Sequence, residues 1–313
     1  MAERRLILLA LAALAACVAF MAIGLRGNLA FALELRATRL LALAQVGVAI
    51  AVSTLLFQTV TANILLTPSI MGLDALYLLG QTLLVFVLGG IGYALLDPRL
   101  KFVAEVGLLM LLALALFLPL LRQRVDVNLL LLAGVVAGIL FRSLTALLSR
   151  LLDPNAFSVV QVASVASFNV VRPDLLAVGL VVTTVGAMLA WRMRHTLDVV
   201  SLGPDIAAGL GVERGPVIAG VMLLVAALVA VSTALVGPVA FLGLLVVALA
   251  EWIVGTRRHH LLLPASIATA LIILVGGQTV LQHGLGGATS LGIVVEFLGG
   301  LVFVVLLLAR SRR

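Results

Sequence analysis

Charged residues are scarce in this sequence of 313 residues. Asp, Glu, Lys and Arg make up 11% of the chain, whereas hydrophobic residues make up 64%. Soluble domains carry about 25% charged and roughly 45–50% apolar residues, so no soluble fold has enough interior for this much apolar surface. The bilayer must therefore act as the solvent for most of the chain. The net charge of +7 comes from basic residues in short loops between apolar runs, which favours control of membrane topology over nucleic-acid binding.

The sequence contains a single lysine, Lys101, which follows Asp97-Pro98-Arg99-Leu100. A phosphate-binding P-loop requires a glycine-rich turn followed by Lys and then Ser or Thr, and this lysine has no such context. The chain also lacks a nucleophile–base set at depth, which argues against a membrane enzyme. We predict that the chain is not an enzyme and does not hydrolyse ATP alone.

Cysteine and histidine are also rare. The one cysteine, Cys17, excludes an intrachain disulfide. It follows Leu14-Ala15-Ala16, which resembles a lipoprotein signal, but the apolar run continues to Leu25 and its length favours a first transmembrane helix. We expect the adjacent pair His259-His260 to lie in a solvated basic loop, because neighbouring residues do not share a helix face and no cysteine or carboxylate completes a metal site. We predict no metal and no cofactor.

Apolar runs of spanning length recur along the chain and predict an all-α membrane protein of about ten transmembrane helices. Apolar residues run continuously instead of alternating, which argues against a membrane β-barrel. No linker interrupts the pattern, so we expect residues 1–313 to form one transmembrane domain. The predicted helices cover residues 6–25, 39–60, 70–93, 101–121, 127–150, 173–193, 215–236, 238–254, 261–281 and 290–309.

Arginines in the loops predict the orientation. With the N-terminus inside, more basic residues fall in cytoplasmic than in outer segments, as the positive-inside rule requires. We therefore expect a multi-pass protein of the inner (plasma) membrane with both termini in the cytoplasm.

A few ionisable residues fall inside predicted spans, where such groups are costly and usually functional. Asp74 and Glu105 lie near predicted helix ends, where their side chains can reach the interface, whereas Arg142 and Glu296 look deep. An ion-coupled secondary transporter is the alternative from another class, although such carriers usually have a denser chain of these groups. A co-purifying ATPase and binding protein would discriminate against it. The roles of Arg142, Glu251 and Glu296 stay open.

The segment from His195 to Gly215 is long and polar in a chain whose other joints are tight. Ser201 and Asp205 are favourable helix caps, and Gly209 and Gly211 are favourable helix stops. We predict two short helices over about 198–212 that form a docking platform on the cytoplasmic face. An ordinary connecting loop is the alternative.

This segment also resembles a known pattern, close to L-D-x-L-S-L-G-E-D-x-A-x-x-L-G-V. Residues 197–212 read LDVVSLGPDIAAGLGV, and residues 237–244 read GPVAFLGL against a second pattern, G-P-I-x-F-V-G-L. Both patterns are those of the iron-siderophore, haem and cobalamin permeases of ABC importers. The resemblance runs from about residue 36 to the C-terminus and implies a type II importer bundle like that of the cobalamin permease.

The resemblance implies partners and site residues. Two permease chains would enclose the substrate path, separate ATP-binding subunits would supply the energy, and a periplasmic or lipid-anchored binding protein would deliver the cargo. Arg36 and Arg39, at the start of the second predicted helix, would form salt bridges to that binding protein; interfacial anchoring by these arginines is the alternative. The ATPase would be gripped by Ser201, Leu202, Gly203, Asp205, Gly209 and Gly211.

The resemblance places the inner gate near the end of the second helix and the start of the fifth. Capping of a helix end by Asn63 is an equal alternative. The residues implied for the gate and the translocation path are Gln58, Asn63, Leu65, Val127 and Asn128.

Several positions depart from the family pattern. The usual P-H-x-x-R gives way to Val247, Ala248 and Glu251, and Thr256-Arg257-Arg258-His259 replaces G-x-D-H. Gln282-His283 replaces an expected outer arginine. These departures resemble the branch that handles catecholate siderophores such as petrobactin, anguibactin and vibriobactin, whose permeases often pair with a different chain. We expect ferric-siderophore uptake by ATP-driven alternating access, with a heterodimer favoured over a homodimer; haem, cobalamin or a metal ion are alternative cargoes.

Overall fold

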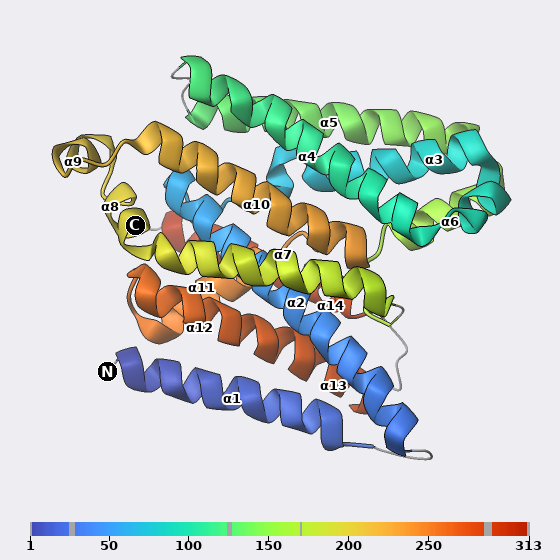
Figure 1. The fold of residues 1–313 in the computed structure, drawn as a ribbon, viewed down its shortest axis with the longest axis horizontal. Coiled ribbons are helices and arrows are strands. Elements are labelled where there is room, and N and C mark those ends of the chain that lie inside the picture. The colour runs from blue at the N-terminus through green and yellow to red at the C-terminus, as the bar shows by residue number, and fades with distance from the viewer. Residues whose placement is uncertain (1, 25–28, 124–126, 170, 285–289, 312–313) are drawn as a thin grey trace.

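The computed structural model describes residues 2–24, 29–123, 127–169, 171–284 and 290–311, with the side chains of 116–128, 130, 306–307 and 309–311 left outside the description. Within these residues the protein is a bundle of helices without strands (Figure 1). The elements are α1 (Ala2–Ala22), α2 (Leu29–Thr61), the 3₁₀ turn η1 (Pro68–Met71), α3 (Leu73–Leu95), α4 (Pro98–Gln123), α5 (Val127–Leu151), α6 (Pro154–Ala163), α7 (Pro173–Arg192), α8 (Arg194–Val200), α9 (Pro204–Gly209), α10 (Arg214–Val236), α11 (Leu242–Val254), α12 (His259–Leu271), the π turn η2 (Ile272–Gly276), α13 (Gly277–Gly284) and α14 (Leu291–Ser311).

The all-α membrane fold predicted from the sequence is confirmed. Seven helices of the described part are long and apolar enough to cross a membrane, and α11 and α14 contribute shorter apolar stretches. With α4, these segments are consistent with the expected count of about ten. The spans expected at 127–150, 173–193 and 215–236 match α5, α7 and α10 within a few residues.

Two boundaries differ from expectation. α2 begins at Leu29 and not at residue 39, because the apolar stretch before Arg36 continues the same helix outward. The segment after α5 contains α6, which was not predicted. Asp153 caps α6 by accepting hydrogen bonds from the backbone nitrogens of Asn155 and Ala156, and Pro154 occupies the first helical turn.

α2 is the central helix of the bundle. It packs against α7, α10, α11 and α12, so it is buried on most sides over its second half. A helix surrounded in this way can be apolar all round, which explains its lack of an amphipathic pattern. By contrast, α1, α5 and α14 expose many large apolar side chains on the outside of the chain, as expected where lipid or another subunit covers the surface.

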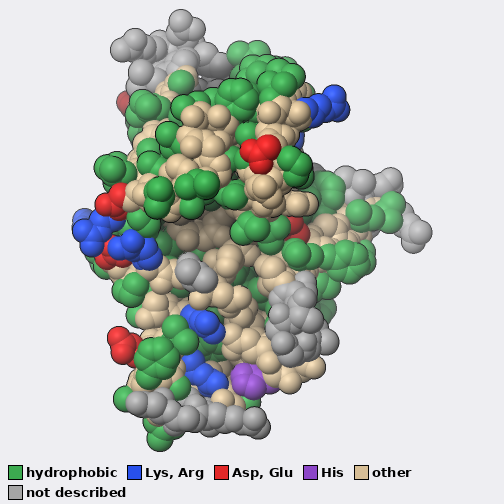
Figure 2. Space-filling model, turned by 90° about the vertical axis from the view of Figure 1, so that its right-hand side faces the viewer, with side chains coloured by type: hydrophobic (Ala, Val, Ile, Leu, Met, Phe, Trp, Pro, Cys, Tyr) green, Lys and Arg blue, Asp and Glu red, His purple; other side chains and the backbone are tan. Residues whose placement is uncertain are grey.

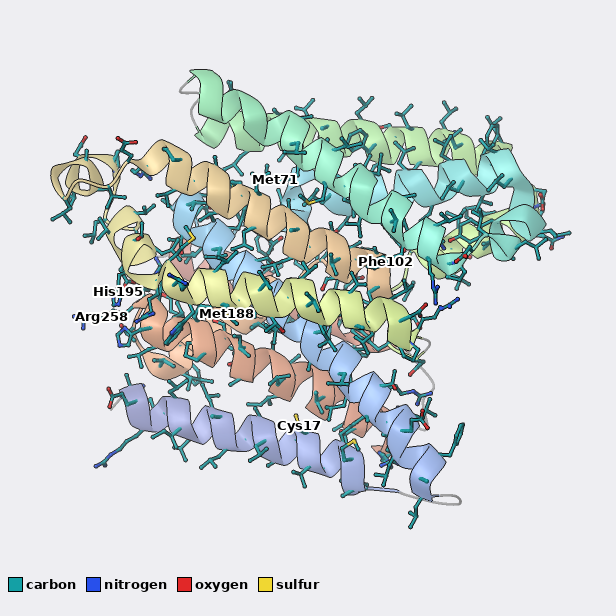
Figure 3. The ribbon with its side chains drawn as sticks, in the orientation of Figure 1. Cys17, Met71, Phe102, Met188, His195 and Arg258 are labelled. Carbon is teal, nitrogen blue, oxygen red and sulfur yellow. The ribbon has the colours of Figure 1, made fainter. Side chains whose placement is uncertain are left out.

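The bundle has two distinct ends. The start of α1, the end of α14, α8 and α9 lie at the left in Figure 1, which we call the inner end. α6, the start of α7 and the α3–α4 joint lie at the right, which we call the outer end. His195 and Arg258 mark the inner end in Figure 3, and Cys17 lies within α1, partly buried against its neighbours.

Candidate functional site

The platform at the inner end consists of the short helices α8 and α9, and α8 begins at Arg194, four residues before the expected range of about 198–212. Leu197 and Val200 of α8 are buried, and so is Ala207 of α9. The capping roles predicted there are partly wrong. Ser201 ends α8 instead of starting a helix, and its hydroxyl donates to the Asp198 carbonyl at 2.6 Å.

The residue that starts α9 is Gly203, not Asp205, and its φ of 102° is a conformation that favours glycine. Asp205 lies in the first turn of α9 without a capping bond, where its charge suits the helix dipole. Gly209 is the last residue of α9, and Gly211 follows with a φ of 78°, so the predicted stop is confirmed at both.

An apolar ridge covers the exposed side of the platform. Leu202, Ile206 and Leu210 follow one another at intervals of four residues and are 53%, 53% and 60% exposed. Ile206 and its neighbour Leu210 at the end of α9 lie one turn apart, whereas Leu202 precedes the helix, just before Gly203. Large apolar side chains that stay exposed beyond the end of a bundle indicate a surface for a partner. Of the three, sequence reasoning had identified only Leu202.

A polar relay joins this platform to two transmembrane helices. Asp198 of α8 accepts hydrogen bonds from both the backbone nitrogen of His259 (2.9 Å) and its ring Nδ1 (2.6 Å). On the other side of the ring, His259 Nε2 lies 2.8 Å from the Thr59 hydroxyl near the end of α2. His259 is only 2% exposed and begins α12, so the solvated loop expected for it is wrong. The expectation failed because the acceptor that buries the ring is 61 residues away in sequence.

Just beyond Thr59, the chain leaves α2 through a tight turn that holds the predicted gate residues. Gln58 Nε2 donates to the Ile64 carbonyl at 2.7 Å, and Asn63 Oδ1 accepts from the Leu65 backbone nitrogen at 3.0 Å. Asn63 thus fixes the turn after the helix, while Leu65 is half-buried. The structure brings Gln58, Asn63 and Leu65 together; Val127 begins α5, and the side chains of Val127 and Asn128 lie outside the described residues.

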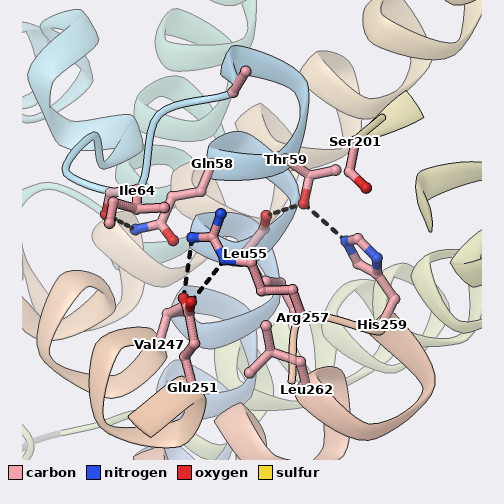
Figure 4. Close-up of a pocket in the computed structure, with 11 residues that line it drawn as sticks. Leu55, Gln58, Thr59, Ile64, Ser201, Val247, Glu251, Arg257, His259 and Leu262 are labelled. Carbon is pink, nitrogen blue, oxygen red and sulfur yellow. Dashed lines mark hydrogen bonds and ion pairs between the residues drawn. The ribbon is translucent and has the colours of Figure 1, made fainter. Parts of the chain in front are cut away.

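The relay and the turn enclose a cavity of about 180 Å³ (Figure 4). Arg257 closes one side of it through an ion pair with Glu251, with Nε 2.7 Å from Oε1 and Nη2 3.1 Å from Oε2. Both partners lie at the departures from the family pattern noted in the sequence, Glu251 at the position of the pattern's arginine and Arg257 beside position 258, where the pattern has aspartate. Further lining comes from Leu55, Ala62, Ser201, Val247 and Leu262.

At the outer end, Arg36 is engaged within the chain. It lies two turns into α2 and not at the start of a helix. Its Nη1 donates to the carbonyls of Phe20 (3.0 Å), Met21 (3.2 Å) and Ile23 (2.6 Å), and Nη2 donates to Gly24 (3.0 Å). These are carbonyls at the carboxyl end of α1, so the guanidinium caps that helix.

Arg39 and His283 complete this part of the outer end. Arg39 is half-buried and its Nε lacks a hydrogen-bond partner within the described residues. The His283 ring packs so closely against Gly24 that a Cβ at this position would collide with it. His283, which stands where an outer arginine was expected, therefore contacts the chain just after α1. Figure 2 looks onto the outer end and shows acidic and basic side chains side by side at one edge.

A polar ring between α3 and α4 was missed by sequence reasoning. Lys101 bonds the Tyr93 hydroxyl, Tyr93 donates to Gln81, and Gln81 donates to Glu105. Lys101 Nζ also lies 3.9 Å from the Glu105 carboxylate, which closes the ring beside a cavity of about 650 Å³. Glu105 is therefore buried by partners from α3 instead of reaching the interface. Gln81 and Tyr93 are polar residues inside a predicted transmembrane span, and they were the sequence signal that could have indicated this ring.

Metal-ligating side chains do not gather in the part of the chain that the structure describes. No group of three or more His, Cys, Asp or Glu residues lies close enough to hold an ion.

Comparison with known proteins gives consistent matches over nearly the whole chain. The model of the FecCD transport family matches residues 6–309. The petrobactin import system permease protein YclO of Bacillus subtilis (strain 168) is 40% identical over 287 residues, which cover 91% of each chain. The petrobactin import system permease protein FatC of Bacillus anthracis is 29% identical and covers 82% of this chain and 73% of that protein. A solved metal-chelate type ABC transporter in an inward-facing conformation has the same fold, with a TM-score of 0.83 at 23% identity, covering 98% of this chain and 99% of that chain.

Proposed function

Since this chain belongs to the FecCD transport family, we propose that it is the membrane permease subunit of an ABC importer for ferric siderophores. Permeases of this family are multi-pass membrane proteins that work with ATP-binding subunits and a substrate-binding protein, and they are not themselves enzymes. The cargo assignment is supported by relatives named as petrobactin import permeases that align over most of the chain. The chain makes or breaks no bond in the cargo; its role is conformational.

The observation that carries this proposal is the connection from platform to gate. The apolar ridge of Leu202, Ile206 and Leu210 offers the ATP-binding subunit a surface, and Asp198 lies four residues before Leu202, in the last turn of α8. A displacement of α8 would pull on His259 and, through it, on Thr59 at the end of α2. The turn with Asn63 and Leu65 follows Thr59 at once. We infer that ATP-driven movement of the platform opens and closes the inner gate through this relay.

The orientation follows from the same platform. ATP-binding subunits are cytoplasmic, so the inner end with α8 and α9 faces the cytoplasm. The start of α1 and the end of α14 lie at that end, so both termini would be cytoplasmic (Figure 1). The whole chain then acts as one permease domain with its binding-protein surface at the outer end.

At the outer end, we propose that Arg39 contributes more to binding-protein docking than Arg36. Arg36 donates to four carbonyls of the chain, whereas the half-buried Arg39 forms no ion pair among the described residues, although its Nε is itself buried. With Arg36 engaged internally and His283 in place of another arginine, this chain offers a weak docking surface. A different second permease that supplies stronger contacts fits this deficit, so we favour a heterodimer over a homodimer.

Reconstitution tests the proposed function. The chain would be placed in proteoliposomes with a second permease, ATP-binding subunits and a binding protein, and uptake of ⁵⁵Fe-labelled siderophore would be followed with and without ATP. We expect ATP-dependent uptake of a ferric catecholate and none of haem or cobalamin. Uptake that proceeds without the ATP-binding subunits would refute the ABC assignment, and active uptake with two copies of this chain alone would refute the heterodimer.

A further inference from the structure

A small polar pocket lies inside the bundle, away from the platform and its cavity. Its volume is about 20 Å³, which is room for one particle the size of a water molecule, since about 10–15 Å³ suffices for that. It lies between α2, α3 and α10, the start of the short 3₁₀ helix η1 with its preceding Thr67, and the non-helical segment 239–240 before α11 (Figure 3 labels Met71, at the end of η1). Apart from Asp74, its polar lining consists of hydroxyls, from Ser53, Thr54, Thr67, Ser69, Ser232 and Thr233.

One of these hydroxyls has no partner. Ser232 is 2% exposed, and its Oγ forms no hydrogen bond within the described structure. Buried polar atoms are almost always paired, and a serine in a helix usually bonds the carbonyl one turn earlier. An orphan hydroxyl that faces a pocket of this size indicates that something with which it can bond occupies the space.

The charges around the pocket indicate the sign of that occupant. Asp74 lines the pocket and accepts a hydrogen bond from Ser69. Arg142 of α5 and Glu296 of α14 interact with Asp74 electrostatically, and Glu296 accepts from the backbone of Ala240, another lining residue. None of these three forms an ion pair within 4.0 Å among the described residues, and only Asp74 lines the pocket, so its carboxyl group has no cationic side chain in contact with it. One monovalent cation would neutralise the group.

The ligand types agree with this sign. Hard cations prefer oxygen donors, and hydroxyl groups and the Asp74 carboxylate are the polar side-chain groups that line this pocket. Membrane transporters hold sodium where helices break and irregular backbone meets side-chain oxygens, and here the long helices α2 and α10 are followed by Thr67 and by the non-helical segment 239–240 at the pocket. We propose that this pocket binds a single monovalent cation of the size of sodium.

Such a cation would stabilise the segment that follows the proposed inner gate. The stretch from Asn63 to Gly72 leaves α2 and returns to α3 through η1, and the pocket holds its Thr67 and Ser69 against Ser232 of α10. Occupancy would therefore stabilise one position of this stretch. The site itself does not depend on which cargo is carried.

A stability measurement on the purified full-length chain in nanodiscs tests the site. Thermal unfolding would be compared in sodium chloride and in choline chloride at equal ionic strength, because choline is too large for the pocket. We expect the midpoint to rise with sodium, saturably, by on the order of 2–4 °C. Equal midpoints in the two salts would overturn the proposal.

Ser232→Ala makes the test specific. If the pocket is empty, this variant removes an unpaired buried hydroxyl and should leave stability unchanged or raise it in either salt. If a cation is bound, the variant should reduce the sodium-dependent rise and require at least about tenfold more sodium, since it deletes one ligand. Asp74→Asn should abolish the rise. Ser266→Ala is the matched control, because Ser266 is equally buried but bonds the Leu262 carbonyl away from the pocket.

Two results with the variants Ser232→Ala and Asp74→Asn would also overturn the proposal. A loss of stability in Ser232→Ala that is equal in sodium and choline would mean that only a water molecule occupies the pocket. A sodium-dependent rise of the same size in Ser232→Ala and Asp74→Asn as in the unchanged chain would place the cation elsewhere.

Discussion

At the inner end, polar contacts connect elements that are far apart in sequence: Asp198 of α8 reaches His259 of α12, which reaches Thr59 of α2. At the outer end, Arg36 of α2 reaches only the end of the preceding helix, and Arg172 and Arg99 both pair with Asp174. The inner contacts form one continuous relay through a buried ring and can transmit a movement across the bundle, whereas the outer ones are separate from one another: Arg36 fixes the end of α1, and the exposed pair of Arg99 with Asp174 joins α4 to α7. The inner end also leaves apolar side chains exposed for a partner. The inner end therefore has the contacts expected for coupling to a partner, whereas the contacts at the outer end mainly stabilise the fold.

The largest effect is expected from Leu202→Glu on the ridge. A charge in the middle of an apolar contact should weaken ATPase binding by roughly 30-fold or more, as the loss of a central contact residue does. The readout is the affinity of the detergent-solubilised permease for its ATP-binding subunit, together with coupled uptake. Leu202→Met, which keeps the apolar volume, is the control and should bind normally. Normal binding by Leu202→Glu would remove the ridge from the interface.

Asp198→Ala should have the next largest effect, because it breaks the relay while leaving the ridge. It deprives the backbone nitrogen and ring of His259 of their acceptor, and unpaired buried groups cost about 1–3 kcal/mol each. We expect ATPase binding to persist while uptake per ATP hydrolysed falls several-fold. Asp198→Asn keeps one acceptor oxygen and should retain more coupling. Unchanged coupling in Asp198→Ala, in a protein that is stably folded, would refute the relay.

Arg36→Gln and Arg39→Gln form a matched pair at the outer end. Arg36→Gln removes the cap of α1 and should lower the free energy of unfolding by roughly 1–3 kcal/mol, seen as a lower thermal midpoint. Arg39→Gln should leave the midpoint unchanged but weaken binding-protein docking a few-fold at low salt, since charges at the rim of an interface mainly affect encounter. The reverse result, with Arg36 affecting docking and Arg39 stability, would invert the assignment.

Much of the fold was readable from the sequence because lipid imposes a simple rule: each spanning segment must be apolar and long. That rule gave the all-α class and the approximate spans. It could not give the outer start of α2, since apolar residues continue past the membrane boundary without a helix stop. α6 was missed although Asp153-Pro154 is a start signal, because its ten residues are too short to span.

The candidate site was predictable only in its local part. The platform of α8 and α9 was found because glycines, a proline and polar residues break the apolar pattern over a contiguous stretch. The relay was not, because Asp198, His259 and Thr59 meet only after folding. Likewise, nothing adjacent to Arg36 in sequence shows that its donors point back to α1. Pairings between distant residues need the packed bundle, and in a single sequence they leave no periodic signal.

The smallest effect is expected from the ion pair beside the inner cavity, and it sharpens what the inner end contributes beyond the relay. Glu251 and Arg257 are partly exposed, so the pair should contribute only about 0.2–1 kcal/mol. Either Glu251→Arg or Arg257→Glu places like charges together and should lower coupled uptake about two- to fivefold at low salt. The double exchange restores an ion pair with reversed polarity and should recover most of the uptake. Both single defects should shrink as salt rises, because the Debye length falls to about 8 Å at 0.15 M and further above it. If the double exchange behaves like the sum of the two single changes, the residues act independently, and the contribution of the ion pair to uptake is refuted.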